Sequence, residues 1–77
     1  MKTIEDITTT IINIRHEHNL SQQQVSQKSD ISFGTYRQIE SRRRKTITVV
    51  ELVKITSAYT NDIDKQTTLL RRILLDK

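Results

Sequence analysis

The sequence predicts an all-α domain of five short helices, and three observations lead to that class. The 77 residues include one glycine and no proline, which disfavours a fold of strands and tight turns. Apolar residues near the start of the chain recur at intervals of three and four, the spacing of one helix face. Helix-capping pairs, such as Ser21 with Gln24 and Thr48 with Glu51, mark helix starts. A chain this short holds one modest core, so residues 1–77 are predicted to form a single domain.

The first predicted helix runs from about Ile4 to His18. Thr3 and Asp6 provide a plausible start, and Asn19 a plausible end. Three consecutive threonines argue against a helix, because β-branched residues are mediocre helix formers. The apolar periodicity outweighs them, and it is carried by Ile4, Ile7, Ile11 and Ile14.

Two shorter helices follow, separated by a turn of three or four residues. The first begins near Gln22 behind its capping box and ends at residues 28–29, and Ser32 can cap the second. The second helix has two apolar residues, Tyr36 and Ile39, on one side and polar residues on the other. This pattern indicates a helix-turn-helix, a motif that places its second helix in the major groove of DNA.

The outer side of this second helix carries the residue types that contact bases. Gln38 can form a bidentate pair with adenine, and Arg37 can pair with guanine or reach a phosphate. Gly34 allows close approach of the backbone, and the ring of Phe33 can touch a thymine methyl group. The predicted base contacts are Phe33, Gly34, Thr35, Arg37 and Gln38.

A basic run follows the same helix and is placed to hold the phosphate backbone. The alternative is a solvated helix face, but such faces usually mix charges, and Glu40 is the only acid between Thr35 and Lys45. DNA binding is therefore the favoured interpretation. The predicted phosphate contacts are Gln22, Ser32, Ser41, Arg42, Arg43, Arg44 and Lys45.

Over roughly residues 11–59 the chain resembles the Cro/C1 repressor family of phage and bacterial regulators. The matching residues are Leu20, Ser21, Gln22, Ile31, Ser32, Thr35, Ile39, Glu40, Arg43 and Arg44. The resemblance implies a lambda-repressor-like five-helix fold, a pairing of Arg15 with Glu40, and a homodimer on a palindromic DNA operator.

The chain departs from that family at two positions where many members have glycine. Asp30 stands in the turn, and Asp adopts a left-handed conformation at modest cost. Arg42 stands after the second helix of the motif and adopts that conformation less readily. We therefore expect the exit of this helix to be built differently, with a connection about one residue longer than is common.

The last two predicted helices begin near Val49 and Ile63, the latter capped by Asn61 or Asp62. The final helix extends to Leu75 or beyond, and its apolar stripe is too wide for packing on one side only. Residues 62–77 are therefore predicted to form a dimerisation helix, although the same leucines could instead complete the monomer core. The predicted interface residues are Leu69, Leu70, Ile73 and Leu74.

The composition argues against several other classes of protein. There is no cysteine, hence no disulfide and no cysteine-based zinc site, and the net charge of +4 is compatible with nucleic acid. His16 and His18 lie two residues apart, so on a helix they diverge and chelate a metal poorly. We expect no enzyme activity, cofactor, metal or membrane span, and a cytoplasmic, nucleoid-associated location.

These features together predict a homodimeric, autoregulatory transcription regulator. The short five-helix chain resembles the controller proteins of restriction–modification systems. A Cro-like repressor from a phage or mobile element fits as well, and RNA polymerase is a further expected partner. A different class, an antitoxin whose helical surface binds a toxin, also remains open. The neighbouring genes would separate these three settings.

Overall fold

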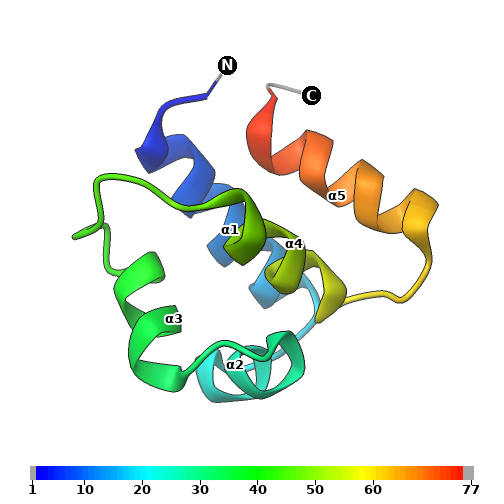
Figure 1. Cartoon of the computed structure of the whole chain (residues 1–77), viewed down its shortest axis with the longest axis horizontal. Coiled ribbons are helices and arrows are strands. Elements are labelled where there is room, and N and C mark those ends of the chain that lie inside the picture. The colour runs from blue at the N-terminus through cyan, green and yellow to red at the C-terminus, as the bar shows by residue number, and fades with distance from the viewer. Residues whose placement is uncertain (1, 76–77) are drawn as a thin grey trace.

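The computed structural model describes residues 2–75, and it confirms the all-α prediction (Figure 1). The described chain forms five helices: α1 (Ile4–Glu17), α2 (Gln22–Ser29), α3 (Phe33–Glu40), α4 (Val49–Ser57) and α5 (Ile63–Leu74). Helix α1 ends one residue before the predicted His18. Helix α5 ends at Leu74, and a continuation past residue 75 lies outside the described residues.

The helices begin where the sequence provides caps. The hydroxyl of Thr48 accepts a hydrogen bond from the Glu51 amide at 3.1 Å, and the Glu51 carboxylate accepts one from the Thr48 amide at 2.9 Å. The same reciprocal box opens α1 and α2. Between the two candidates for α5, Asp62 is the cap, with its carboxylate accepting from the Asp64 amide at 2.8 Å. Local side-chain bonds therefore satisfy N–H groups that each first turn leaves unpaired.

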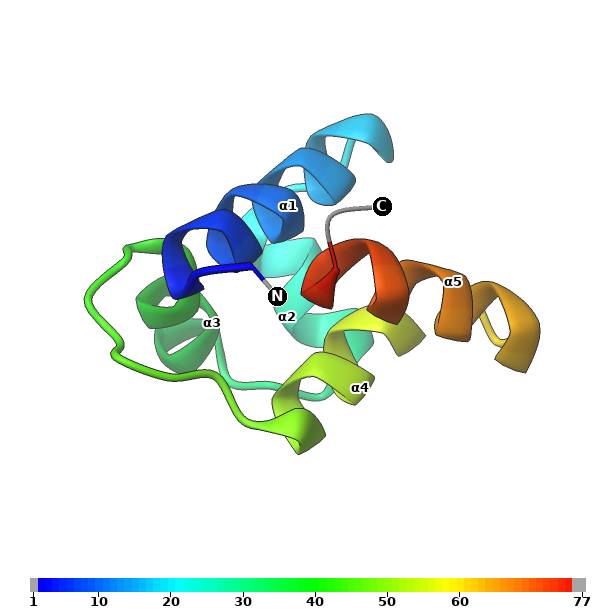
Figure 2. The ribbon, with the colours of Figure 1, turned by 90° about the horizontal axis from the view of Figure 1, so that it is seen from above.

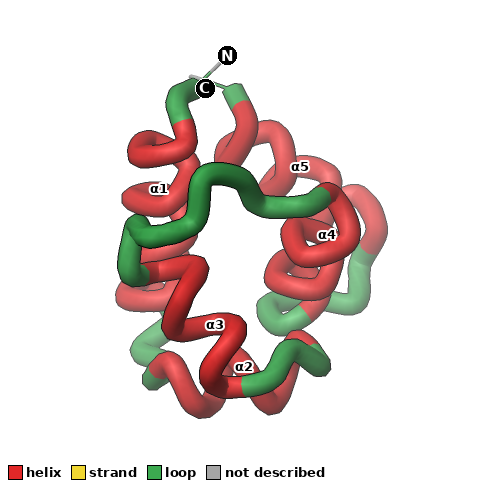
Figure 3. Tube along the Cα trace, turned by 60° about the vertical axis from the view of Figure 1, so that its left-hand side comes forward, coloured by secondary structure: helices red, strands yellow, loops and turns green. Residues whose placement is uncertain are grey.

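The core lies where all five helices meet. Helix α2 packs against α3 and α4, α1 packs against α3 and α5, and α4 packs against α5. Figure 2 shows α3 and α5 on opposite sides of the molecule, and Figure 3 shows the α3–α4 connection running from beside α1 across to α4. The buried apolar side chains are Ile11, Ile14, Val25, Ile31, Tyr36, Ile39, Leu52, Ile55 and Ile73.

The first and last described helices are joined near the chain ends. The Lys2 side-chain nitrogen donates to the Arg72 carbonyl at 2.6 Å and to the Thr10 hydroxyl at 2.9 Å. Figure 1 shows the start of α1 and the end of α5 beside each other, away from α3. Helix α5 therefore closes the fold over α1 and α4.

Ile73 requires a correction to the predicted dimer interface. Its exposed fraction is 0%, so it belongs to the core of the single chain and offers no surface to a second subunit. The physical reason is the rotation of α5, which turns this residue inward and leaves its neighbours half-buried at the edge of the core. Those neighbours are Leu69, Leu70 and Leu74.

Within residues 2–75, three residues other than glycine have a positive φ, and each follows a helix. Asn19 has φ 56°, Asp30 has φ 58° and Arg42 has φ 64°. The expectation of a different exit at Arg42 is therefore wrong, because this residue adopts the backbone conformation that a glycine would supply. Its guanidinium donates to the Thr9 hydroxyl at 2.8 Å, which ties the connection to α1. For a residue with a side chain this conformation costs about 1–2 kcal/mol.

Candidate nucleic-acid interface

Helices α2 and α3 form a helix-turn-helix around the left-handed Asp30. The amide of Ile31 donates to the Ser26 carbonyl at 3.1 Å and closes the turn. The Ser32 hydroxyl then accepts from the Thr35 amide at 3.2 Å and starts α3. Because Tyr36 and Ile39 are buried, the opposite side of α3 faces solvent.

The outer side of α3 carries four of the five predicted base contacts. Phe33, Gly34, Arg37 and Gln38 are exposed, whereas Thr35 is half-buried. The Thr35 hydroxyl oxygen accepts a 2.8 Å hydrogen bond from the Ser32 hydroxyl. Thr35 therefore supports the start of α3 and sits at the border of this exposed face.

A hollow beside α3 brings predicted base and phosphate contacts together. It is lined by Gln22, Gly34, Arg37, Gln38, Glu40, Ser41 and Arg43. Gln22 comes from the first turn of α2, and Arg43 comes from the connection after α3. Contacts to DNA phosphates beside a recognition helix fix the position of that helix on the duplex. This arrangement therefore suits phosphate binding next to base contacts.

Gly34 has no structural requirement for glycine. A β-carbon added there meets nothing within 4 Å, and its φ is not positive. The three left-handed positions, by contrast, are occupied by other residues. The single glycine of the sequence thus stands on the exposed face of α3, where a missing side chain lets a ligand approach the backbone closely.

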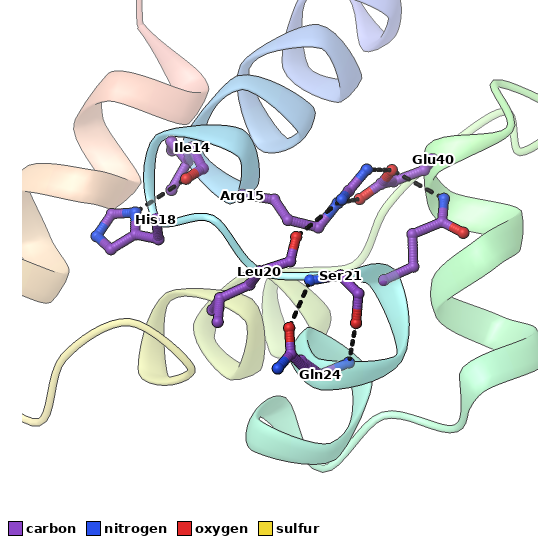
Figure 4. Close-up of polar contacts among 8 residues, drawn as sticks. Ile14, Arg15, His18, Leu20, Ser21, Gln24 and Glu40 are labelled. Atoms are coloured by element: carbon purple, nitrogen blue, oxygen red, sulfur yellow. Dashed lines mark hydrogen bonds and ion pairs between the residues drawn. The ribbon is translucent and has the colours of Figure 1, made fainter.

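A buried ion pair anchors α3 to α1 (Figure 4). Arg15 donates to the two carboxylate oxygens of Glu40 at 2.8 and 3.0 Å, and their side chains are 12% and 4% exposed. Arg15 also donates to the Leu20 carbonyl at 2.9 Å. The structure therefore brings together the two residues of the expected pair, in the bidentate geometry that favours arginine.

Gln22 extends this pair into α2. Its side-chain nitrogen donates to Glu40 at 3.0 Å and retains a second hydrogen for a phosphate oxygen. Burial alone would raise the pKa of Glu40, but the hydrogen bonds from Arg15 and Gln22 outweigh burial and lower it. The carboxylate therefore stays charged at neutral pH, with each of its oxygens bonded.

Two tyrosines lie near this pair, and the sequence placed one of them, Tyr36, on the apolar side of its helix. The hydroxyls of Tyr36 and Tyr59 are buried without a hydrogen-bond partner among the described residues. Burial raises the pKa of both, that of Tyr59 to about 12. The Tyr59 ring lies 4.7 Å from that of His18 at the end of α1. Their role is packing, and the apolar periodicity around position 36 was the signal for it.

The basic run after α3 divides into tethered and exposed side chains. Arg42 reaches Thr9, and Arg44 pairs with Glu51 at 2.6 Å. Arg43 is exposed and lines the hollow, and Lys45 is also exposed. Ser41 uses its hydroxyl to donate to the Gln38 carbonyl at 2.7 Å. Sequence reasoning missed the Arg44–Glu51 pair because the acid had already been assigned to the capping box.

The segment around the two histidines takes part in contacts between helices. Glu17 pairs with Arg72 of α5, and a ring nitrogen of His18 lies 2.9 Å from the Ile14 carbonyl oxygen.

Within residues 2–75 no three His, Cys, Asp or Glu side chains group as a metal site would require. Among the same residues, no helix has the length and apolar character needed to cross a membrane.

Comparison with known proteins identifies the family. A search of curated proteins and a search of solved structures each found no match. A family model described as helix-turn-helix matches residues 11–66, which include α2, α3 and α4 and most of the chain. Together with the exposed polar side of α3, this match shows that the chain belongs to the Cro/C1-type helix-turn-helix family of DNA-binding regulators.

Proposed function

We propose that this protein is a sequence-specific transcription regulator that binds an inverted-repeat operator as a homodimer. The observation that carries this proposal is that Gln22 and Arg43 line one hollow together with residues of the exposed face of α3. Phosphate contacts there would hold α3 in the major groove, and Gln38 would then reach a base edge. Ser32, Ser41 and Lys45 would add contacts at the ends of this face.

Dimerisation would double the number of base contacts. A single α3 offers few of them, and two half-sites about 34 Å apart require a two-fold assembly. An apolar groove provides a surface for a second copy. It is lined by Ile4, Ile7, Lys45, Thr46, Ile47, Val49, Leu52, Leu70 and Leu74.

The rim of this groove supports a second copy as its occupant. Val49 and Val50 at the start of α4 are 73% and 63% exposed, so the groove continues into an apolar surface. Two-fold symmetry would place the rim of one subunit on the groove of the other, as an isologous interface requires. Leu70 and Leu74 retain the role expected of α5, while Leu69 lies on its other side near His18.

We propose autoregulation as the biological role, in the manner of a restriction–modification controller protein, with RNA polymerase as a further partner in the cytoplasm. A phage or mobile-element repressor would use the same surfaces. An antitoxin is the second candidate function, because the apolar groove would equally accept a toxin. A methyltransferase and endonuclease, phage genes or a toxin gene beside the coding sequence would distinguish these settings.

Footprinting on the DNA upstream of the protein's own gene tests the proposal, together with sedimentation of the free protein. We expect two protected half-sites with centres about one helical turn apart, and a dimer at tens of micromolar. A protein that stays monomeric at this concentration and protects a single half-site would contradict the dimer and favour the antitoxin. Absence of any protected site would contradict autoregulation.

A further inference from the structure

We infer that Phe33 and Arg37 act as one unit that recognises a thymine and a guanine within two base pairs of each other. This inference rests on the proposed sequence-specific role of α3 and extends it to the DNA sequence itself. The two residues lie one helical turn apart, and the Arg37 guanidinium carbon is 5.5 Å from the centre of the Phe33 ring. Both residues are exposed, and Phe33 keeps 41% of its surface accessible.

The ring leaves the hydrogen-bonding edge of Arg37 free. A guanidinium stacked on an aromatic face directs its N–H groups outward in the guanidinium plane. Other arginines are already engaged within the described residues: Arg15, Arg44 and Arg72 form ion pairs, and Arg42 is bonded to Thr9. Arg37 takes part in none of these ion pairs. Its stacking on Phe33 thus orders the side chain in advance, so that less rotamer freedom is lost on binding.

The chemistry of the two side chains selects the bases. The planar N–H fork of Arg37 matches the O6 and N7 acceptors of guanine, which accept a bidentate pair from arginine. The Phe33 ring has no hydrogen-bonding group, and the apolar feature of the major groove is the thymine methyl group. The 5.5 Å separation lies between one base step of about 3.4 Å and two such steps. The thymine and the guanine therefore lie one or two base pairs apart.

A phosphate is the competing partner for Arg37. A phosphate contact would use its charge but would leave the Phe33 ring exposed to water, with no partner for its apolar surface. The hollow that Arg37 lines also contains Arg43, and the exposed guanidinium of Arg43 can bind a DNA phosphate. Base recognition gives both Phe33 and Arg37 a partner, and this distinguishes the two alternatives.

Selection from a random duplex library tests the inference, because it needs no knowledge of the operator. We expect wild-type protein to enrich a motif with thymine one or two base pairs from guanine. In the selected duplex, deoxyuridine at that thymine removes one methyl group and should weaken binding about 4-fold. The Phe33→Ala variant should bind the thymine and deoxyuridine duplexes equally.

Arg37 is tested by two variants of different charge. Arg37→Lys keeps the charge but loses the planar fork, so discrimination against a replaced guanine should fall without disappearing. Arg37→Ala should lose the guanine from the enriched motif, with a loss of discrimination of roughly 5- to 150-fold. Lys65→Ala is the matched control for loss of one positive charge, because Lys65 is exposed on α5 and lines a different hollow, and its motif should be unchanged.

The outcomes separate this inference from the proposed function. Failure to enrich any motif would overturn sequence-specific binding itself. Enrichment of a motif that lacks thymine and guanine at this spacing would overturn only the inference. The inference would also be overturned if Arg37→Ala left the motif unchanged. The same would follow if Arg37→Lys and Arg37→Ala lowered the affinity equally on all duplexes.

Discussion

Replacing Gly34 with alanine should raise the stability of the protein and weaken its binding to DNA. The added methyl group meets no protein atom within 4 Å, so the fold accepts it without a clash. Alanine is also the better helix former, because it loses less backbone entropy on folding. Gly34 is the second residue of α3, and the proposed binding mode turns its side of the helix toward the major groove. The two effects therefore have opposite signs.

The expected sizes are measurable. The gain in helix propensity is about 0.5–1 kcal/mol, which raises the Tm of a domain this size by roughly 2–8 °C. A methyl group forced into a close contact costs about 1–3 kcal/mol, judged from overpacked protein interiors. That cost corresponds to an affinity loss of roughly 5- to 150-fold.

Thermal unfolding followed by circular dichroism and DNA binding by fluorescence anisotropy at one fixed salt concentration measure the two effects. Thr67→Ala is the matched control, because this exposed position on α5 gains helix propensity away from α3. It should raise the Tm and leave affinity unchanged. A lower Tm for Gly34→Ala would show that the methyl group is not accommodated, and unchanged affinity would show that DNA does not approach this backbone.

Three further predictions concern the ion pairs and the groove. Glu40→Ala should cost about 3–5 kcal/mol in unfolding free energy, because it leaves a largely buried arginine without its partner. The pKa of Glu40 is lowered in the folded protein, so its stabilising contribution is present at neutral pH. It should decline below about pH 4.3, the ordinary value for glutamate, and disappear below the lowered folded value. Arg43→Ala should reduce the slope of log binding constant against log salt concentration by about one in magnitude. Arg44→Ala should reduce this slope less and should also lower the Tm, because Arg44 is paired with Glu51. Val49→Lys should give a folded monomer in sedimentation, since 73% of this side chain is exposed at the groove.

Each of these predictions has its own control. Glu40→Gln should reduce the fall in unfolding free energy that the wild-type protein shows at acid pH. If the fall is unchanged in this variant, another group controls acid unfolding. Equal slope changes for Arg43→Ala and Arg44→Ala would show that the Glu51 pair opens on DNA. Ile63→Lys places the same charge at a side chain that is 76% exposed and lies outside the groove, so it should remain dimeric. If both lysine variants dissociate, the groove is not the specific interface.

Local interactions made the helices predictable from the sequence, and tertiary packing explains the predictions that were wrong. Capping boxes such as Thr48 with Glu51 act within a few residues, so the starts of the helices could be recognised in the sequence. The rotation of α5 could not, because its apolar stripe is wide enough to bury either flank. The structure buries Ile73 and leaves Leu70 half-buried at the groove.

The candidate site was predictable to a similar degree. Residue type and spacing indicated the outer face of α3, since Tyr36 and Ile39 had to turn inward. The partners of Arg42 and Arg44 lie 33 and 7 residues away along the chain, and no local pattern specifies such contacts. Packing of the connection against α1 and α4 determines which basic side chains remain free. This is why Arg43 could not be separated from its neighbours by sequence alone.

The burial of Ile73 has a consequence for how the protein acquires activity during synthesis. Translation proceeds at about 5–20 residues per second, and α2 and α3 leave the ribosome before α5 does. Until Ile73 arrives, Ile11, Ile14 and Leu52 lack part of the cover that the finished core gives them. We therefore expect the helix-turn-helix to reach its full stability only after the last turn of α5 has emerged. A chain interrupted before that turn should have a less stable core and bind DNA more weakly.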